Sequence, residues 1–527
     1  MTVAPSARRR PSPSRVAFVL CALVWPCAGG AAPPAPLPLD ADIATQQARM
    51  TAGDFDSHAL VAAYLARIAA LDRRGPRLQS VIELNPRALE DADALDAERR
   101  AGHVRGPLHG IPVLLKDNID AVPMANSAGS LALASHRPAR DAFLVARLRA
   151  AGAVILGKTN LSEWANFRSS FSSSGWSARG GQTRNAYAAD RSPCGSSAGT
   201  ATAIAASLAT VGVGTETDGS IVCPSSVSGL VGLKPTVGLV SRDGIVPISA
   251  SQDTAGPMAR SVADAAQLLD ALAGADATDP ATQAPDRAQP RYADAVTPGA
   301  LRGARIGVLR RSAGFHPPTD AVFERALASL RARGAELVDV EIPTAGQWGE
   351  AEMQVLLYEF KDGLNRYLAA SRAPVPSLEA LIAFNTEHAD AEMRWFGQDL
   401  FEQAQAKGPL TDPIYLEARA KARRLARTEG LEATLKRHRL QALVAPTTGP
   451  AWVIDPIDGD HFLGEGYGIA AVAGTPSLTV PMGDVHGLPV GLVFLGPAWS
   501  ESRLIGLAYD FEQATHARRA PTLDDAR

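Results

Sequence analysis

Three short segments in the first half of the chain hold lysine and serine residues in settings that suit nucleophilic chemistry. Lys116 directly follows an apolar run at residues 111–115, where burial would favour the neutral amine. Ser196 and Ser197 lie in a Gly/Ser-rich loop, and Ser220 follows a glycine, which lets backbone N–H groups approach a substrate closely, as an oxyanion hole requires. Taken singly, Lys116 is typical of a solvated residue at a sheet edge, the Gly/Ser loop of a linker, and the Gly-Ser pair of a turn. Only the three segments together indicate a catalytic site.

The hydrophobic periodicity alternates between strand and helix patterns, which favours an α/β architecture able to position these residues. A helix that Asp56 or Ser57 caps is predicted from apolar residues at helical spacing: Leu60, Tyr64, Ile68 and Leu71. Other helices are expected at residues 142–148, 200–209 and 353–368, and strands at residues 81–82, 111–115, 153–158, 304–309, 443–445 and 477–480. Residues 274–298, rich in Ala, Asp and Pro, have the composition of a surface connection.

The composition of the chain sets broad limits on its class. The 527 residues are 46% hydrophobic and 20% charged, which is ordinary for a globular protein and argues against a disordered chain. With 52 basic against 55 acidic residues, the chain lacks the positive charge that nucleic-acid binding requires, so no nucleic-acid partner is expected. His, Cys and Asp residues show no metal-ligand spacing and no phosphate-binding loop occurs, so neither a metal nor a cofactor is predicted.

The first 32 residues have the pattern of an export signal. Arginines at positions 8, 9, 10 and 15 precede an apolar run at residues 16–25, Pro26 ends the run, and small residues at 28–32 offer cleavage positions. The alternatives are a misassigned start codon and a retained anchor, for which the run is shorter than the roughly 20 residues of a spanning helix. We predict a cleaved signal peptide at residues 1–32, a periplasmic or secreted protein, and no stable membrane association after cleavage.

Four cysteines are present, and two of them, Cys21 and Cys27, lie in this leader. The remaining pair, Cys194 and Cys223, is too few for a disulfide framework, so a large apolar core must hold the fold together. An oxidising compartment would permit one bridge between them, but the sequence does not show that their Cα atoms lie close enough. Two buried free thiols are the favoured expectation.

The three segments together resemble the amidase signature family of Ser-cisSer-Lys hydrolases. That family has a Gly/Ser-rich loop with paired serines, a Gly-Ser nucleophile element and a Gly-Leu-Lys-Pro-Thr segment, which correspond here to residues 192–199, 214–224 and 232–236. Ser220 follows Ser196 by 24 positions, the separation of the family pattern. The resemblance covers roughly residues 39–513 and implies one amidase domain at residues 39–515, with an α/β amidase-signature fold: a large mixed β-sheet core covered by helices on both faces.

Finer details are similar to the bacterial peptide amidases of that family, at residues 193–197, 215–224, 240–244, 251–260 and 357–361. This resemblance implies hydrolysis of the C-terminal carboxamide of peptides, giving the free acid and ammonia. One alternative is a broad-specificity amidase or aryl acylamidase acting on small amides. An amidotransferase A subunit is disfavoured by the export signal, and a catalytically silent binding protein with this fold is disfavoured because Lys116, Ser196 and Ser220 are all intact.

A catalytic mechanism follows from the resemblance and from the chemistry of serine. A serine hydroxyl is a weak nucleophile that needs a base, and no histidine sits in a comparable motif, so His109 is expected to be structural. Lys116, neutral in the resting enzyme, is expected to take a proton through Ser196, which deprotonates Ser220. Ser197 is expected to hydrogen-bond within this relay, and the oxyanion is expected to bind the backbone N–H groups of Thr217, Asp218, Gly219 and Ser220.

The sequence departs from the family pattern at several positions, two of which affect the expected chemistry. Val222 stands where many members carry Arg, and the loss of this cation argues against a glutamine-handling amidotransferase. Asp218 replaces a glycine, without harm if only its backbone N–H is used. The other departures are Cys194, Ala198, Thr200 and Glu216. The expected partner is a peptide or small-molecule amide substrate, selected by pocket walls at residues 347–409 and 452–467; no oligomeric state is predicted.

Overall fold

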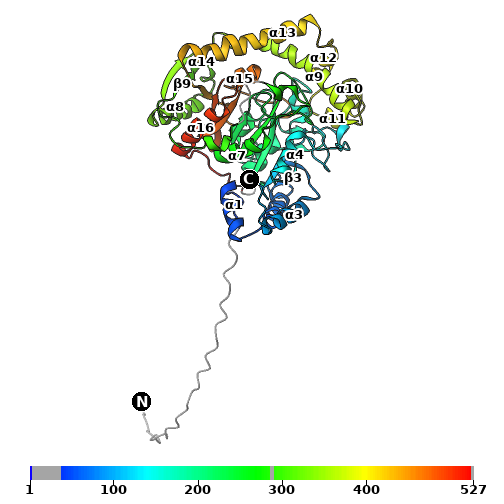
Figure 1. Cartoon of the computed structure of the whole chain (residues 1–527). Helices are drawn as coiled ribbons and strands as arrows, with labels where there is room; N and C mark the ends of the chain where they lie inside the picture. The colour runs from blue at the N-terminus through cyan, green and yellow to red at the C-terminus, as the bar shows by residue number, and fades with distance from the viewer. Residues whose placement is uncertain (3–36, 285–289, 524–527) are drawn as a thin grey trace. The chain divides into compact units, whose positions relative to one another are not determined.

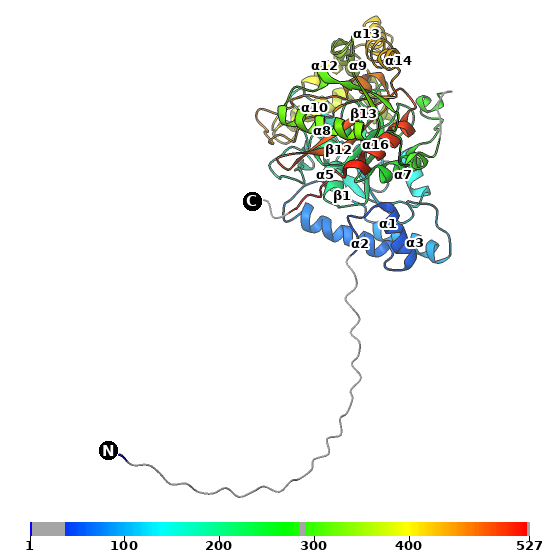
Figure 2. The ribbon, with the colours of Figure 1, turned by 90° about the vertical axis from the view of Figure 1, so that its left-hand side faces the viewer.

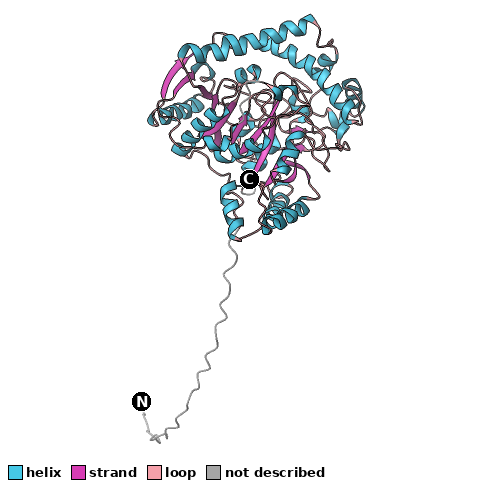
Figure 3. Ribbon diagram, in the orientation of Figure 1, coloured by secondary structure: helices cyan, strands magenta, loops and turns pink. Residues whose placement is uncertain are grey.

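One mixed β-sheet runs through the centre of the described chain (Figure 3). The computed structural model describes residues 1–2, 37–284 and 290–523, and Leu37–Arg527 form one unit. Within the described residues, eleven strands join in the order β1 (Val81–Leu84), β3 (Val154–Thr159), β2 (Pro112–Lys116), β6 (Val211–Glu216), β8 (Thr254–Ala259), β7 (Val231–Lys234), β12 (Ser477–Val485), β13 (Leu488–Leu495), β11 (Ala442–Pro446), β9 (Arg305–Leu309) and β10 (Glu336–Val340). β3, β2 and β6 are parallel, as are β11, β9 and β10, and the other neighbours are antiparallel. A separate short pair is formed by β4 (Trp176–Ser177) and β5 (Gly181–Gln182).

Helices surround this sheet (Figure 1). They are α1 (Ile43–Ala52), α2 (Ser57–Arg67), α3 (Ala88–Arg100), α4 (Phe143–Ala150), α5 (Ala198–Ala205), α6 (Val222–Val227), α7 (Val262–Leu272), α8 (Pro317–Ala332), α9 (Gly349–Ser371), α10 (Leu378–Glu387), α11 (Ala389–Glu392), α12 (Asp399–Gln405), α13 (Pro413–Arg423), α14 (Glu432–His438), α15 (Gly468–Ala473) and α16 (Glu501–Thr515). α4, α7, α16 and α8 contact one another in that order, and α7, α16 and α8 also pack against the sheet. α5 and α6 form a second contacting pair. Figure 2 shows α1, α2 and α3 at one end, with α9, α12, α13 and α14 at the other. The predicted large mixed sheet covered by helices is confirmed.

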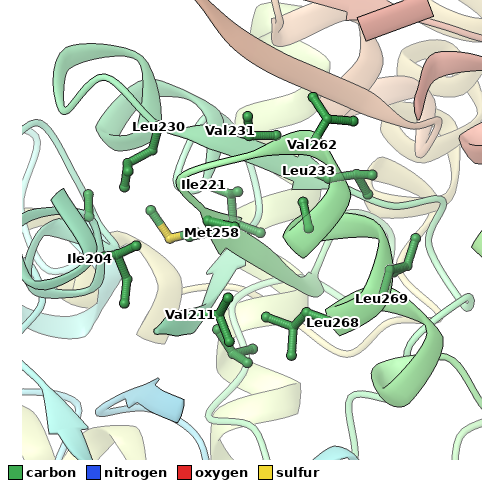
Figure 4. Packing of buried hydrophobic residues seen from close by; sticks show 14 of the residues in the cluster. Ile204, Val211, Ile221, Leu230, Val231, Leu233, Met258, Val262, Leu268 and Leu269 are labelled. Carbon is green, nitrogen blue, oxygen red and sulfur yellow. The ribbon is translucent and has the colours of Figure 1, made fainter. Parts of the chain in front are cut away.

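Strand β6 shows how side chains are divided between the two faces of the sheet. Val211 and Val213 are buried in the apolar core, and Figure 4 shows Val211 beside Leu268 of α7. Gly212 and Gly214 face the other side, where a Cβ would lie 2.6 Å from Thr200 Cγ2 and 2.8 Å from Ser197 Oγ. Alternate residues of a strand point to opposite faces, so the glycines let α5 and the loop before it lie directly on the sheet.

The positions of most expected elements agree with the structure, and the Ala-rich helix is the main exception. Asp56 caps α2 as predicted, since its carboxylate accepts a hydrogen bond from the amide of Ala59 at 2.8 Å. The Ala-rich helix is expected at residues 200–209, but α5 ends at Ala205. The chain turns at Ser207, whose φ is 53°, and the amide of Leu208 donates back to Ala203 O at 2.8 Å. The last residues of the expected helix therefore form the turn into β6.

In the first part of the expected surface connection at residues 274–298, exposed and buried residues alternate. Asp276 and Asp279 are buried, and their carboxylates accept hydrogen bonds from Ser241 Oγ at 2.6 Å and from the Arg242 guanidinium at 2.6 Å. These bonds hold the segment against the body of the enzyme, because a buried carboxylate needs such partners. Residues 285–289 of the expected connection lie outside the described residues.

The predicted leader falls almost entirely outside the described residues, since residues 3–36 are not among them. Along the part of the chain that the structure covers, no helix combines the length and apolar character needed to cross a membrane.

Candidate active site

Lys116, at the end of β2, is fully buried and its amine has three close oxygen neighbours. Nζ lies 2.7 Å from Ser196 Oγ, 2.9 Å from Thr215 Oγ1 and 3.1 Å from Thr215 O. Burial lowers the pKa of Lys116 to about 7, and the carboxylates of Glu216 and Asp253 oppose this effect. Near neutral pH the buried Lys116 amine is therefore a mixture of its neutral and protonated forms.

Ser196 is held in place by its neighbours on both sides of the Gly/Ser loop. The Gly195–Ser196 peptide bond is cis, and Ser196 O accepts a hydrogen bond from the amide of Ser162 at 3.1 Å. A side chain at position 195 would place its Cβ 2.2 Å from Ser162 Oγ, so glycine is required there. The Ser196 hydroxyl is in this way directed at Lys116.

Ser197 connects the loop to the two other segments. Its hydroxyl donates to Thr215 O at 3.1 Å, and its amide donates to Ser220 O at 3.2 Å. Ser196 and Ser220 line the same cleft, where Ser220 is 9% exposed. The structure thus brings together the lysine and all three serines that the sequence predicts.

The segment that carries Ser220 is a tight turn between β6 and α6. Gly219 has a φ of 76°, and a Cβ there would lie 2.4 Å from the ring of Tyr467. Glu216 closes the turn, because its carboxylate accepts hydrogen bonds from the amides of Ile221 at 2.6 Å and Val222 at 3.0 Å. Burial raises the pKa of Glu216, while the charge of Lys234 and these amide bonds lower it.

The four predicted oxyanion donors are not equivalent. The amide of Gly219 is directed at the Glu216 carboxylate. The amides of Thr217, Asp218 and Ser220 have no acceptor among the described residues. Three free backbone N–H groups in one turn beside a serine form an arrangement that can stabilise an oxyanion.

The side chain of Asp218 belongs to a group of half-buried acids behind this turn. Burial raises the pKa of Asp218 well above its usual range, and the neighbouring Glu465 and Glu352 raise it further. Gln252 donates to Glu352 at 2.9 Å and to Thr217 O at 3.3 Å. The Asp218 carboxyl therefore lies with these acids, and its backbone N–H has no acceptor among the described residues.

A cavity of about 1330 Å³ opens onto Ser196 and Ser220. Its walls come from residues 118–120, 138–140, 242–254 and 278–281, and from α9 between Glu359 and Arg372. The predicted wall at residues 347–409 is therefore present in part. The predicted wall at 452–467 is wrong, because Tyr467 packs behind the Ser220 turn and no residue of that range lines the cavity.

Comparison with known proteins agrees with this geometry. A family model described as Amidase matches residues 59–505. The chain belongs to the amidase family. The structure of native peptide amidase from Stenotrophomonas maltophilia is 61% identical with a TM-score of 0.88, covering 92% of this chain and 98% of that one. The peptide amidase PAM in complex with the competitive inhibitor chymostatin is 62% identical with a TM-score of 0.90, covering 91% and 98%. A probable amidase of Arabidopsis thaliana is 40% identical over 495 residues, 92% of this chain and 90% of that protein. The protein is an enzyme that hydrolyses amide bonds.

A disulfide joins Cys194 to Cys223 in this amidase, with their Cα atoms 6.1 Å apart. The favoured expectation of two free thiols is therefore wrong. Cys194 lies two residues before Ser196, and Cys223 lies three residues after Ser220, at the start of α6. The bridge spans a sequence separation of 29 residues that contains both serines. Because those residues are far apart in sequence, only the folded arrangement of the loop and α6 brings the sulfur atoms together.

Loss of this bridge is expected to lower the free energy of unfolding of the amidase. Closing a loop of 29 residues restricts the unfolded chain, which corresponds to about 3–4 kcal/mol. Urea unfolding with and without a thiol reductant measures the difference. The double variant Cys194→Ala, Cys223→Ala is the control, since it should match the reduced protein and ignore the reductant; a difference below about 1 kcal/mol would contradict the expectation.

Three further residues complete the site of the amidase, although the sequence argument assigned them no role. Thr215 accepts from Lys116, Asn118 donates to Thr215 Oγ1 at 3.0 Å, and Glu216 shapes the Ser220 turn. Their signal was position, since Thr215 and Glu216 lie within the Gly-Ser element and Asn118 follows Lys116 by two residues. His109 lies elsewhere: it is buried, with Nε2 2.9 Å from Leu95 O, and burial lowers its pKa.

Proposed function

We propose that this amidase removes the C-terminal carboxamide of peptides, giving the free acid and ammonia through an acyl-enzyme on Ser220. The observation that carries the proposal is the cleft of about 1330 Å³ that opens onto Ser196 and Ser220. Pockets for drug-sized ligands measure roughly 300–1,000 Å³, so this cleft suits several residues of a peptide better than a small amide. The 61–62% identity to peptide amidase structures supports the same substrate class.

The base in this mechanism is the neutral amine of Lys116. A neutral amine has two N–H groups and one lone pair. The two N–H groups match Thr215 O and Thr215 Oγ1, which leaves the lone pair for the hydroxyl proton of Ser196. Ser196 passes its proton to Lys116 as it takes the proton of Ser220, whose Oγ attacks the carbonyl carbon.

The negative charge that develops on the carbonyl oxygen is stabilised by the free amides of Thr217, Asp218 and Ser220. Such a donor contributes about 3–4 kcal/mol because it is in place before the reaction begins. Ser196 then returns a proton to the leaving nitrogen, the C–N bond breaks, and ammonia departs. Water attacks the acyl-enzyme by the same relay, releases the peptide acid and restores Ser220.

Ammonia release from an N-acetyl dipeptide amide tests the proposal. We expect release by the wild-type enzyme and none by Ser220→Ala. A small aliphatic amide and an anilide are the comparison substrates, and both are expected to react more slowly. Hydrolysis of these two without hydrolysis of the dipeptide amide would reject the peptide substrate and favour a broad-specificity amidase.

The rate is expected to rise with pH through the pKa of Lys116, which is about 7. Only the neutral amine accepts a proton, so kcat/KM should fall about tenfold per pH unit below this value and level off above it. A profile measured with the N-acetyl substrate, which does not titrate in this range, checks the sign.

A matched variant separates Lys116 from an acid beside the Ser220 turn. Burial raises the pKa of Glu465 to about 7, so Glu465→Gln removes one other group that titrates in this range. The variant should keep the wild-type profile. A profile that becomes flat in Glu465→Gln, with chemistry still rate-limiting, would contradict the assignment to Lys116.

We also propose that residues 1–32 are a cleaved signal peptide and that the enzyme works in the periplasm or outside the cell. The Cys194–Cys223 bridge supports this location, because disulfides persist in oxidising compartments. We take residues 39–515 as the amidase domain, a range that contains the matched residues 59–505. Fractionation of cells followed by mass analysis of the N-terminus tests the export; an uncleaved cytosolic protein would reject it.

A further inference from the structure

The carboxylates that line the cleft differ in how their oxygen atoms are bonded. Both oxygens accept hydrogen bonds in Asp243, Asp253, Asp279 and Glu359. Asp362 is exposed and pairs with Arg366, and Glu216 is committed to the Ser220 turn. In the described part of the cleft, Glu216 and Asp120 each accept all of their side-chain hydrogen bonds on one oxygen. The second oxygen of Glu216 is enclosed within the Ser220 turn, whereas Asp120 lies on the cleft wall outside that turn.

Two donors hold Asp120 by this single oxygen. Tyr367 of α9 donates its hydroxyl to Asp120 Oδ1 at 2.8 Å, and Asn126 donates Nδ2 to the same atom at 2.6 Å. Asn126 also lies 2.9 Å from the Tyr367 hydroxyl, which closes a triangle of polar groups. Oδ2 has no donor among the described residues, while the side chain as a whole is 7% exposed and lines the cleft. The carboxylate is therefore fixed in direction with one oxygen unused.

Hydrogen bonds connect the part of the cleft wall that contains Asp120 to the catalytic relay. Asn118 bonds Thr215, the amide of Val246 donates to Asn118 O at 2.9 Å, and the amide of Asp120 donates to Gly244 O at 2.8 Å. Asp120 follows Asn118 by two residues, so the two lie at most about 7 Å apart, the length of two residues of an extended peptide. This separation along the cleft suits a group one or two residues upstream of the scissile carboxamide.

Asp120 also lacks a cation of its own in the described structure. The cations whose charge acts on it are Lys158 and Arg140. Arg140 is paired with Asp243 through hydrogen bonds of 2.5 and 2.7 Å. Lys158 is committed elsewhere, since its Nζ lies 2.6 Å from Ile119 O and 3.2 Å from Asp117 Oδ1. Burial raises the pKa of Asp120, in keeping with a carboxylate that has lost water without gaining an ion pair. A positively charged ligand would supply what this position lacks.

On the basis of the proposed function, we infer that Asp120 is a specificity-determining residue that binds an ammonium group of the substrate through Oδ2. The enzyme then favours peptide amides with a free amino terminus one residue upstream of the carboxamide. Tyr367 and Asn126 are positioning residues, because they aim the carboxylate without contacting the substrate. A carboxylate that is held in place before the substrate arrives binds it more tightly, because little conformational freedom is lost on binding.

The test compares one dipeptide amide in three forms: with a free amino group, with an N-acetyl group and with an N-succinyl group, all near pH 7. In the wild-type enzyme we expect kcat/KM to fall in that order, with the free amine about tenfold or more above the acetyl form, as for a hydrogen bond to a charged group. Asp120→Asn keeps the acceptor for Tyr367 and removes the charge. This variant should raise KM for the free-amine substrate and so lower its kcat/KM. Its kcat/KM for the acetyl form should stay within about threefold of the wild-type value, and its kcat/KM for the succinyl form should rise.

Asp362→Asn is the matched control, because it removes another cleft carboxylate that already pairs with an arginine, and its order of substrates should remain that of the wild type. Equal wild-type rates on the free and acetylated amides would overturn the inference, and so would an equal loss on all three forms in a folded Asp120→Asn. The wild-type comparison needs no variant, so a failure of Asp120→Asn to fold leaves the inference testable. If none of the three amides releases ammonia, the proposed function itself has failed.

Discussion

Ser220→Ala is expected to reduce kcat for a peptide amide by on the order of 10⁴–10⁶-fold, and Lys116→Ala by a comparable factor. The first change removes the nucleophile. The second removes the acceptor for the Ser196 proton, whose oxygen lies 2.7 Å from Lys116 Nζ in a fully buried site. No other base among the described residues bonds Ser196 Oγ, so the relay has no substitute.

The double variant distinguishes a shared relay from two independent contributions. Groups that act as one unit lose nearly all activity when either is removed, so the double variant should be no worse than about tenfold below either single one. Single-turnover ammonia release measures the three rates, and circular dichroism checks that the buried Lys116→Ala still folds. A double variant whose loss equals the product of the two single losses would show that Lys116 acts outside the relay.

Glu216→Ala is expected to reduce kcat by about 10²–10³-fold, the cost of a misaligned oxyanion donor. The carboxylate bonds the amides of Ile221 and Val222, and these bonds shape the turn that presents the free amides of the Ser220 segment. Without it, the amides of Gly219, Ile221 and Val222 lose their acceptor, and Lys234 loses one of the acids that stabilise its charge. Steady-state kinetics should show the loss in kcat more than in KM.

Glu216→Gln is the control for this prediction, because it retains an acceptor oxygen of nearly the same geometry. It should keep most of the activity that Glu216→Ala loses, although its thermal stability should fall because Lys234 loses one of its negative neighbours. If Gln and Ala lose activity equally, the charge of Glu216 rather than its hydrogen bonds would be responsible. Full activity of Glu216→Ala would contradict its role in shaping the turn.

The sequence determined the residue types of the relay and the close approaches that it needs. Lys116 could be assigned only together with the two serine segments, because a lysine that follows a strand is by itself typical of a solvated edge residue. In the structure Lys116 ends β2 and is fully buried, which lowers the pKa of the amine. The glycines at 195, 212, 214 and 219 all have neighbours within 3 Å of an added Cβ. Such positions accept no other residue type, so local sequence carries their signal.

Only the tertiary structure determines which residues form the cleft wall, that Cys194 and Cys223 are joined, and which groups the acidic side chains contact. Asp120 meets Tyr367 across 247 positions of sequence, and Cys194 meets Cys223 because α6 turns back toward the Gly/Ser loop. Whether Asp218 points to substrate or to Glu352 depends on how α9 packs behind the turn. Each of these contacts joins elements whose separation along the chain says nothing about their distance in space, whereas the relay residues are marked by the strand, loop and turn in which each one lies.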